Sequence, residues 1–331
     1  MALDYTPRSM RVIGLAFILM VVLLATPLAA EAQPPTAQRH RVALLNAAAP
    51  GQSEAVLRER LRALGYVEGT NLVIDARAAD GRVERLSDLI RELLDAKPEV
   101  IVTFGTTAAQ AAKAATTTIP IVMAFAGDPV GTRLVASLAK PGGNVTGMSL
   151  ATSELPGKRL DLLKEVIPRL TRLTVLGDIS RQIEIQETET AARALGLTVA
   201  LVELTRAEGF DRALGEVSRT RPQAMFVINT AVTITHRARI VEFALKNRVS
   251  LVGTQSGWAE AGALMNYASS ITAACRQAAE YVDKILKGAR PADLPIQQPT
   301  KFELVINLKT AKALRLTIPP SVLGRADRVI E

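Results

Sequence analysis

Short apolar runs alternate with helical patterns along the chain from residue 41 onward. The runs Val100–Phe104 and Ile119–Phe125 are apolar almost throughout and end abruptly in small or polar residues. This is the pattern of strands buried on both faces of a parallel sheet. An Ala-rich helix is predicted between these runs, and Gln52–Leu64 has apolar residues at helical spacing before Gly65. This order of strands and helices predicts an α/β protein.

The first half of the pattern holds five strand-like segments with helices between them. One of these helices is predicted over Val83–Ala96, which ends before Pro98. Strands that alternate with helices in this way are typical of a parallel, doubly wound sheet. The five predicted strands are Arg41–Asn46, Asn71–Arg77, Val100–Phe104, Ile119–Phe125 and Val145–Leu150.

The pattern begins again at Leu155, which predicts a second lobe of the same kind. Its predicted helices are Leu155–Ile167, Gln186–Leu195, Phe210–Thr220 and Thr235–Asn247, and a long helix over Ile271–Leu286 follows the repeated pattern. Its predicted strands are Arg172–Gly177, Thr198–Leu204, Ala224–Asn229, Ser250–Gly253, Ala263–Tyr267 and Phe302–Ile306. We therefore predict an α/β fold with two doubly wound parallel-sheet lobes joined by a hinge. The candidate hinge stretches are Ser149–Thr152, Tyr267–Ser270 and Gln297–Phe302.

Residues 1–32 have the pattern of a secretory signal peptide. Arg8 and Arg11 precede an apolar run over Val12–Ala25, which is short for a bilayer span, and small residues follow it. We expect cleavage after Ala30 or Ala32 and a periplasmic location. A retained membrane anchor is the alternative.

Composition argues against several functional classes. The formal net charge is +8, but Lys and Arg are scattered and aromatic residues make up only 4%, which does not suit a nucleic-acid surface. The single cysteine, Cys275, allows no intramolecular disulfide and reads as a structural thiol. His40 and His236 lack metal-ligand spacing, and the chain has no Walker A or G-x-S-x-G motif. We therefore expect a protein that is not an enzyme and needs no metal or cofactor.

Polar residues directly after the predicted strands are the candidate site, because ligands bind at the carboxyl ends of strands in open α/β sheets. Thr106 and Thr107 stand at a helix start and would suit an anion, whereas the carboxylate of Asp128 would suit a cation. A small zwitterion would satisfy both. The alternatives are that the threonines cap the helix and that Asp128 stabilises its own turn.

Further polar residues end strands in both predicted lobes. They would converge on a closing cleft, although each one alone is more often an ordinary loop residue. Phe104 and Phe125 are interpreted as core residues, and Trp258 either lines the cleft or packs beneath a loop. The further candidate ligand contacts are Asn46, Asp178, Asn229, Thr230, Thr254 and Gln255.

Several long segments resemble one known family. They are DPV at 128–130, LVASLAKPGGNVTGMS at 134–149, GKRLDLLKEVIP at 157–168, the stretch from YVDKILKGARPADLP to KFELVINLKTAKAL at 281–314, and LTIPPSVLGRADRVIE at 316–331. Together they resemble the ABC-transporter substrate-binding proteins of the tryptophan/tyrosine-binding type. The resemblance covers essentially all of the chain after the predicted signal peptide.

The resemblance implies a type 1 periplasmic-binding fold with a ligand held between two lobes. The N-terminal lobe would contain 40–150 plus about 269–300, and the C-terminal lobe 151–268 plus about 301–331. The resemblance also implies delivery of the ligand to a permease and its ATPase in the inner membrane.

We expect, on this basis, an exported, monomeric solute-binding protein of an ABC importer. Its ligand would be a small amino-acid-like molecule, because a sugar usually needs more aromatic stacking faces than this chain supplies. A periplasmic sensor that acts on a receptor is the first alternative, and an enzyme on an α/β scaffold is the second.

Overall fold

The structure is a computed structural model that describes residues 39–178 and 181–331. Residues 39–331 form one compact unit. The predicted signal peptide lies outside the described residues. Within the described part of the chain, no helix is both long and apolar enough to cross a bilayer.

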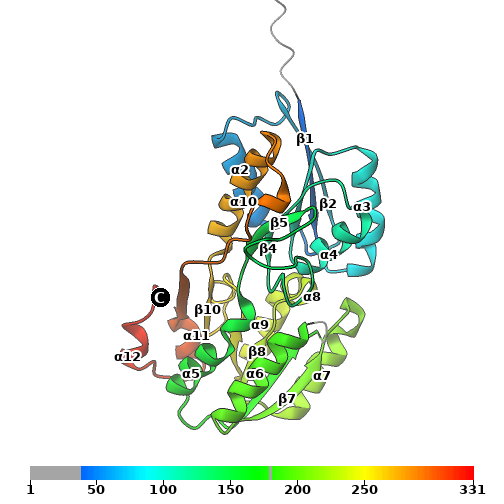
Figure 1. The fold of residues 1–331 in the computed structure, drawn as a ribbon. Helices are drawn as coiled ribbons and strands as arrows, with labels where there is room; N and C mark the ends of the chain where they lie inside the picture. The colour runs from blue at the N-terminus through cyan, green and yellow to red at the C-terminus, as the bar shows by residue number, and fades with distance from the viewer. Residues whose placement is uncertain (1–38, 179–180) are drawn as a thin grey trace, which may run out of the picture. The chain divides into compact units, whose positions relative to one another are not determined.

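The first sheet consists of five parallel strands in the order β2-β1-β3-β4-β5. Its topology is that of a doubly wound sheet, as the sequence predicts (Figure 1). The strands are β1 (His40–Asn46), β2 (Leu72–Ala78), β3 (Val100–Phe104), β4 (Ile121–Ala126) and β5 (Val145–Ser149).

Helices cover both faces of this sheet, which explains why its central strands are apolar throughout. Successive side chains of a strand point to opposite faces. In β1, Val42 and Leu44 therefore pack into one core with the helices α2 (Gln52–Ala63) and α10 (Ile271–Leu286). Ala43 and Leu45 pack into a second core with α3 (Leu86–Asp95) and α4 (Thr106–Ala115). A short 3-10 turn over Val83–Arg85 precedes α3, where the sequence pattern predicts one continuous helix.

The second sheet has seven strands in the order β12-β11-β10-β9-β8-β6-β7. Its pairs are parallel except for β10 and β11, which are antiparallel. The strands are β6 (Arg172–Gly177), β7 (Thr198–Glu203), β8 (Ala224–Val227), β9 (Ser250–Gly253), β10 (Met265–Ser269), β11 (Phe302–Asn307) and β12 (Arg328–Ile330).

The antiparallel strand corrects the expectation of two wholly parallel sheets. Strand β10 ends at Ser269, where the chain leaves the second sheet for α10. The chain returns through 291–301 and begins β11 at Phe302, which pairs with Ser269. A strand that starts beside the point where its neighbour ends must run in the opposite direction.

Helices also cover both faces of the second sheet. On one face, Val175 and Phe226 share a core with α5 (Pro156–Val166) and α6 (Gln182–Ala194). On the other, Leu176 and Met225 share a core with α7 (Phe210–Thr220) and α9 (Arg237–Lys246). The remaining helices are the short α8 (Ala231–Thr235), α11 (Leu308–Ala313) and α12 (Pro320–Leu323).

Helix α10 joins the first sheet although it directly follows a strand of the second. It packs against α2 and β4, and its residues Ala278 and Val282 are fully buried in the core of the first sheet. On these contacts we propose to divide the chain into lobe 1, residues 40–150 and about 269–300, and lobe 2, residues 151–268 and about 301–331. The chain then crosses between the lobes three times.

Candidate functional site

A cavity of about 890 Å³ is lined by residues of both lobes. This volume lies within the range of small-molecule sites, roughly 300–1,000 Å³. Lobe 1 contributes the carboxyl ends of β1, β3 and β4 and the first residues of α2, α4 and α10. Lobe 2 contributes residues that follow β6, β8 and β9. The cavity thus lies where the carboxyl ends of parallel strands bring loops and helix N-termini together.

The structure brings seven of the nine candidate residues to this cavity. Their role in ligand binding stays a prediction, but their common location is a structural finding. The seven are Asn46, Thr106, Thr107, Asp178, Asn229, Thr230 and Gln255.

Thr106 is held at the contact between the two lobes. Its Oγ1 accepts hydrogen bonds from the backbone N–H of Gly127, at 3.2 Å, and from Nη1 of Arg181, at 2.9 Å. The N-cap position of α4 belongs to Gly105, and no side chain caps this helix. The alternative that a threonine hydroxyl caps the helix is therefore wrong.

Asp128 is one of the two candidates that the structure does not bring to the cavity; the other is Thr254. Its carboxylate accepts a hydrogen bond of 2.8 Å from the backbone N–H of Gly131, which closes the turn after β4. Asp128 lines a separate hollow of about 190 Å³, together with Arg181 and Glu184. The turn-stabilising alternative describes this geometry, because the side chain serves its own backbone two to three residues on.

The asparagines at the strand ends hold neighbouring loops. Asn46 donates from Nδ2 to Glu54, at 2.8 Å, and its Oδ1 accepts from the backbone N–H of Ala48. Asn229 accepts a hydrogen bond of 2.9 Å from Nε1 of Trp258. Trp258 is fully buried and is not among the lining residues, so it packs beneath the loop rather than facing the cavity.

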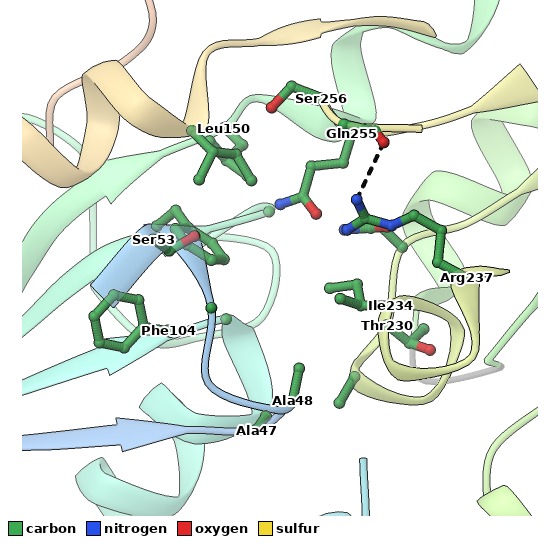
Figure 2. Close-up of a pocket in the computed structure, with 18 of the residues that line it drawn as sticks. Ala47, Ala48, Ser53, Phe104, Leu150, Thr230, Ile234, Arg237, Gln255 and Ser256 are labelled. Carbon is green, nitrogen blue, oxygen red and sulfur yellow. Dashed lines mark hydrogen bonds between the residues drawn. The ribbon is translucent and has the colours of Figure 1, made fainter. Parts of the chain in front are cut away.

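Thr230 and Thr254 use their hydroxyls in hydrogen bonds to the backbone, whereas Gln255 points into the cavity. Thr230 caps α8, and its hydroxyl accepts from the backbone N–H of Thr233. Thr254 is almost fully buried and accepts from the backbone N–H of Asn229, so it supports the loop and does not line the cavity. Figure 2 shows the amide of Gln255 directed into the cavity, toward the guanidinium of Arg237.

The lobe 1 wall of the cavity is partly apolar. Phe104 and Phe125 pack edge to face with ring centroids 6.1 Å apart, and both belong to the core beneath α2 and α10. They are buried as predicted, and they also line the cavity beside Leu150. Ala47 and Ala48 continue this surface in the loop that precedes α2 (Figure 2).

Sequence reasoning missed three arginines that line the cavity from lobe 2: Arg328 at the start of β12, and two that lie at helix starts. Arg181 directly precedes α6, and Arg237 is the first residue of α9. It also missed Ser53, in the first turn of α2. A signal for Arg237 exists in the sequence, since it follows the predicted strand Ala224–Asn229 within one short helix.

Arg181 belongs to a chain of polar contacts that runs from the core of lobe 2 to Thr106. Its Nη2 lies 3.5 Å from the buried carboxylate of Glu184, which in turn lies 3.5 Å from Nη1 of Arg159. Arg159 is fully buried and donates to the backbone carbonyls of Tyr267 and Thr254. Burial lowers the pKa of Arg159 to about 10, against the opposing effect of Glu184, so its guanidinium remains charged at neutral pH.

Arg237 has a different environment, because no carboxylate pairs with it among the described residues. Its Nη1 donates to the backbone carbonyl of Gly257, at 3.1 Å, and its Nε is buried without a hydrogen-bond partner. The guanidinium carbon lies 5.5 Å from the ring centroid of Trp258. Burial lowers the pKa of Arg237.

The described residues hold no group of three or more His, Cys, Asp or Glu that would suit a metal ion. Cys275 is buried in α10, and burial raises the pKa of its thiol to about 12, so it is not activated as a nucleophile.

One family model matches nearly all of the chain that follows the predicted signal peptide. The model describes an ABC transporter substrate binding protein, and it matches residues 47–330. A curated relative, the tyrosine-binding protein of Clostridioides difficile strain R20291, is 26% identical over 253 residues, which cover 76% of this chain and 72% of the relative.

Solved structures show the same fold. A conserved domain protein from Vibrio cholerae is 27% identical with a TM-score of 0.81, and the alignment covers 88% of this chain and 100% of that one. An ABC domain from Streptococcus pneumonia in complex with L-Trp is 25% identical with the same TM-score and the same coverage of both chains. A 5-methylthioribose transporter solute binding protein from Thermotoga lettingae has the same fold at 12% identity, with a TM-score of 0.58 over 88% of this chain and 98% of that one.

Proposed function

We propose that this chain, which belongs to the family of ABC transporter substrate-binding proteins, captures a small amino-acid-like ligand in the cavity between its two lobes. The observation that carries this proposal is the cavity itself, to which both lobes contribute polar residues at the ends of parallel strands. A ligand that contacts both lobes stabilises their approach, and this approach is the signal that a transporter can recognise.

The shape and polarity of the cavity favour an amino acid with an apolar side chain. Phe104, Phe125 and Leu150 form an apolar wall in lobe 1, whereas Thr107, Gln255 and Arg237 bring polar atoms to the same space. Pockets for small ligands combine such an apolar surface with a few placed polar groups. The names of the tyrosine-binding relative and of the L-Trp complex support an aromatic amino acid.

We propose further that the protein works outside the cytoplasm as a monomer and delivers its ligand to a membrane permease driven by an ATPase. The signal-peptide pattern of residues 1–32 and the family support this location and these partners. A strain that lacks the protein should then lose high-affinity uptake of the labelled ligand and regain it with the intact gene. Unchanged uptake would contradict the role in import.

The capture itself is tested by calorimetry and thermal unfolding of the purified protein with each common L-amino acid. A ligand at 100-fold its Kd adds about 2.7 kcal/mol to the free energy of unfolding, so the melting temperature should rise by several degrees. Gln255→Ala should weaken binding, and Gln186→Ala, on the exposed face of α6, should not. If no amino acid binds at millimolar concentration, the proposed ligand class is wrong.

A further inference from the structure

We propose that Arg237 binds the anionic end of the ligand, and that this contact makes the cavity select carboxylates over the corresponding amides and amines. The inference rests on the proposed function, and it names the chemical group that lobe 2 recognises. It also predicts that a carboxylate without any amino group would bind.

The first argument is the missing counter-ion of Arg237. The other arginines near the cavity have carboxylate partners: Arg159 and Arg181 share Glu184, and Arg328 pairs with Glu260. Arg239, two residues further along the same helix, pairs with Asp211. Among the described residues, Arg237 has no such partner. A half-buried charge without a partner is unfavourable. An anion that entered the cavity would therefore supply the missing counter-ion of Arg237.

The second argument is that the guanidinium is held in place before any ligand arrives. Nη1 is fixed by the carbonyl of Gly257, and the face of the group lies against Trp258, which Asn229 anchors in turn. Gly257 has a φ of +92°, and a Cβ there would lie 2.8 Å from Nη1 of Arg237. The glycine therefore leaves room for the guanidinium, and the ordering of a flexible side chain is already complete.

The third argument is the position of Arg237 in the cavity. Figure 2 shows its guanidinium beside the amide of Gln255, with Phe104, Ala47 and Ala48 across the open space. Nη1 uses one of its N–H groups on Gly257, which leaves the N–H groups of Nη2 without any protein acceptor that the structure records. A carboxylate accepts hydrogen bonds from a guanidinium in a charge-assisted geometry that Lys or Gln reproduces only in part. A ligand with a carboxylate at one end and an apolar body fits a cavity that has Arg237 on one side and apolar residues on the other.

The test compares four probes that differ in one group each. They are L-tyrosine, L-tyrosinamide, tyramine and 3-(4-hydroxyphenyl)propionate, each titrated into the wild-type protein and into Arg237→Gln. A charge-assisted hydrogen bond corresponds to about a 10- to 100-fold difference in Kd. The wild type should prefer L-tyrosine over its amide by about this factor, and Arg237→Gln should lose the preference while binding the amide as the wild type does.

Two controls separate recognition from packing. Arg239→Gln removes an exposed guanidinium from the same helix and should keep the acid-over-amide preference. Trp258 is the single tryptophan, so an unchanged emission maximum in Arg237→Gln shows that the indole has not moved. Arg237→Lys keeps the charge and should retain part of the preference.

The outcomes distinguish this inference from the proposed function. If the wild type binds the propionate but no amino acid, and Arg237→Gln loses that binding, the amino-acid proposal fails and the role of Arg237 stands. If Arg237→Gln keeps the full acid-over-amide preference, Arg237 only packs on Trp258 and the inference is overturned, whereas amino-acid capture stands. If none of the four probes nor any other carboxylate binds, both are overturned.

Discussion

Nη1 of Arg181 donates a hydrogen bond of 2.9 Å to Oγ1 of Thr106, and this bond joins lobe 2 to lobe 1 beside the cavity. The side chain of Arg181 is only 13% exposed, and its Nη2 forms an ion pair with the carboxylate of Glu184. The same hydroxyl accepts from the backbone N–H of Gly127, so the contact reaches the loop after β4. In the proposed capture of a ligand between the lobes, this bond would form only when the lobes approach each other, and it would favour the arrangement that encloses the ligand.

Arg181→Met should weaken ligand affinity about tenfold without unfolding the protein. A hydrogen bond from a charged donor contributes roughly 1.5–3 kcal/mol, and here the loss falls on the approach of the lobes rather than on either core. Calorimetry measures the affinity, and small-angle scattering measures the spread of the lobes without ligand. Arg193→Met, an exposed change on the same helix α6, is the control.

Thr106→Val tests whether the two residues act together. If Arg181 acts through Thr106, the double variant should bind about as weakly as the weaker single variant, because each change removes the same bond. Additive losses in affinity would instead assign the two side chains to separate contacts with the ligand.

Arg159→Met should lower the free energy of unfolding by about 3–5 kcal/mol. It removes one of the two arginine partners of the buried Glu184, and it leaves two backbone carbonyls without their guanidinium donor. Urea unfolding followed by circular dichroism measures the loss. The double variant Arg159→Met/Glu184→Leu should recover part of it, since no carboxylate is then left buried. A loss below about 1 kcal/mol in the single variant would show that water reaches Glu184.

The fold was predictable because the apolar pattern of each strand and helix can be recognised from a few consecutive residues. Runs such as Val100–Phe104 are apolar at every position, which two covered faces require, and their polar ends mark the edge where ligands bind. The direction of β11 was not predictable in this way. An apolar run such as Phe302–Ile306 looks the same in a parallel and an antiparallel pair, and only the path of the chain through lobe 1 decides the direction.

The site was predictable only where it coincides with strand ends. Thr106 and Gln255 lie two residues after the ends of strands, so their location could be inferred. Arg181 and Arg237 lie at helix starts, where a charged residue usually faces solvent, and their location at the cavity depends on contacts with Thr106 and Gly257, which are distant in sequence. For Asp128 the strand-end rule predicted a ligand contact, but its carboxylate accepts a hydrogen bond within its own turn.

Ionisation of the Tyr66 hydroxyl should make the protein less stable at alkaline pH. Its hydroxyl donates a hydrogen bond of 2.9 Å to Asp283 of α10, and burial, together with this carboxylate, raises the pKa of the phenol to about 12. The folded pKa lies above the unfolded value of about 10, so the stabilisation is fully present below pH 10 and is lost as pH rises through 12. The expected loss is about 1–2 kcal/mol across this window, because solvent screens part of the interaction.

Tyr66→Phe isolates this effect from other groups that titrate in the same range, such as Tyr281, whose pKa burial also raises. The variant should be less stable than the wild type at pH 8, because Asp283 loses a hydrogen-bond donor, and the gap should narrow as pH approaches 12. Urea unfolding at a series of pH values measures the gap, and absorbance at 295 nm follows ionisation of the phenols. A gap that stays constant from pH 8 to 12 would mean that Tyr66 ionises equally well in the folded chain, and the hydrogen bond to Asp283 would then contribute nothing to stability.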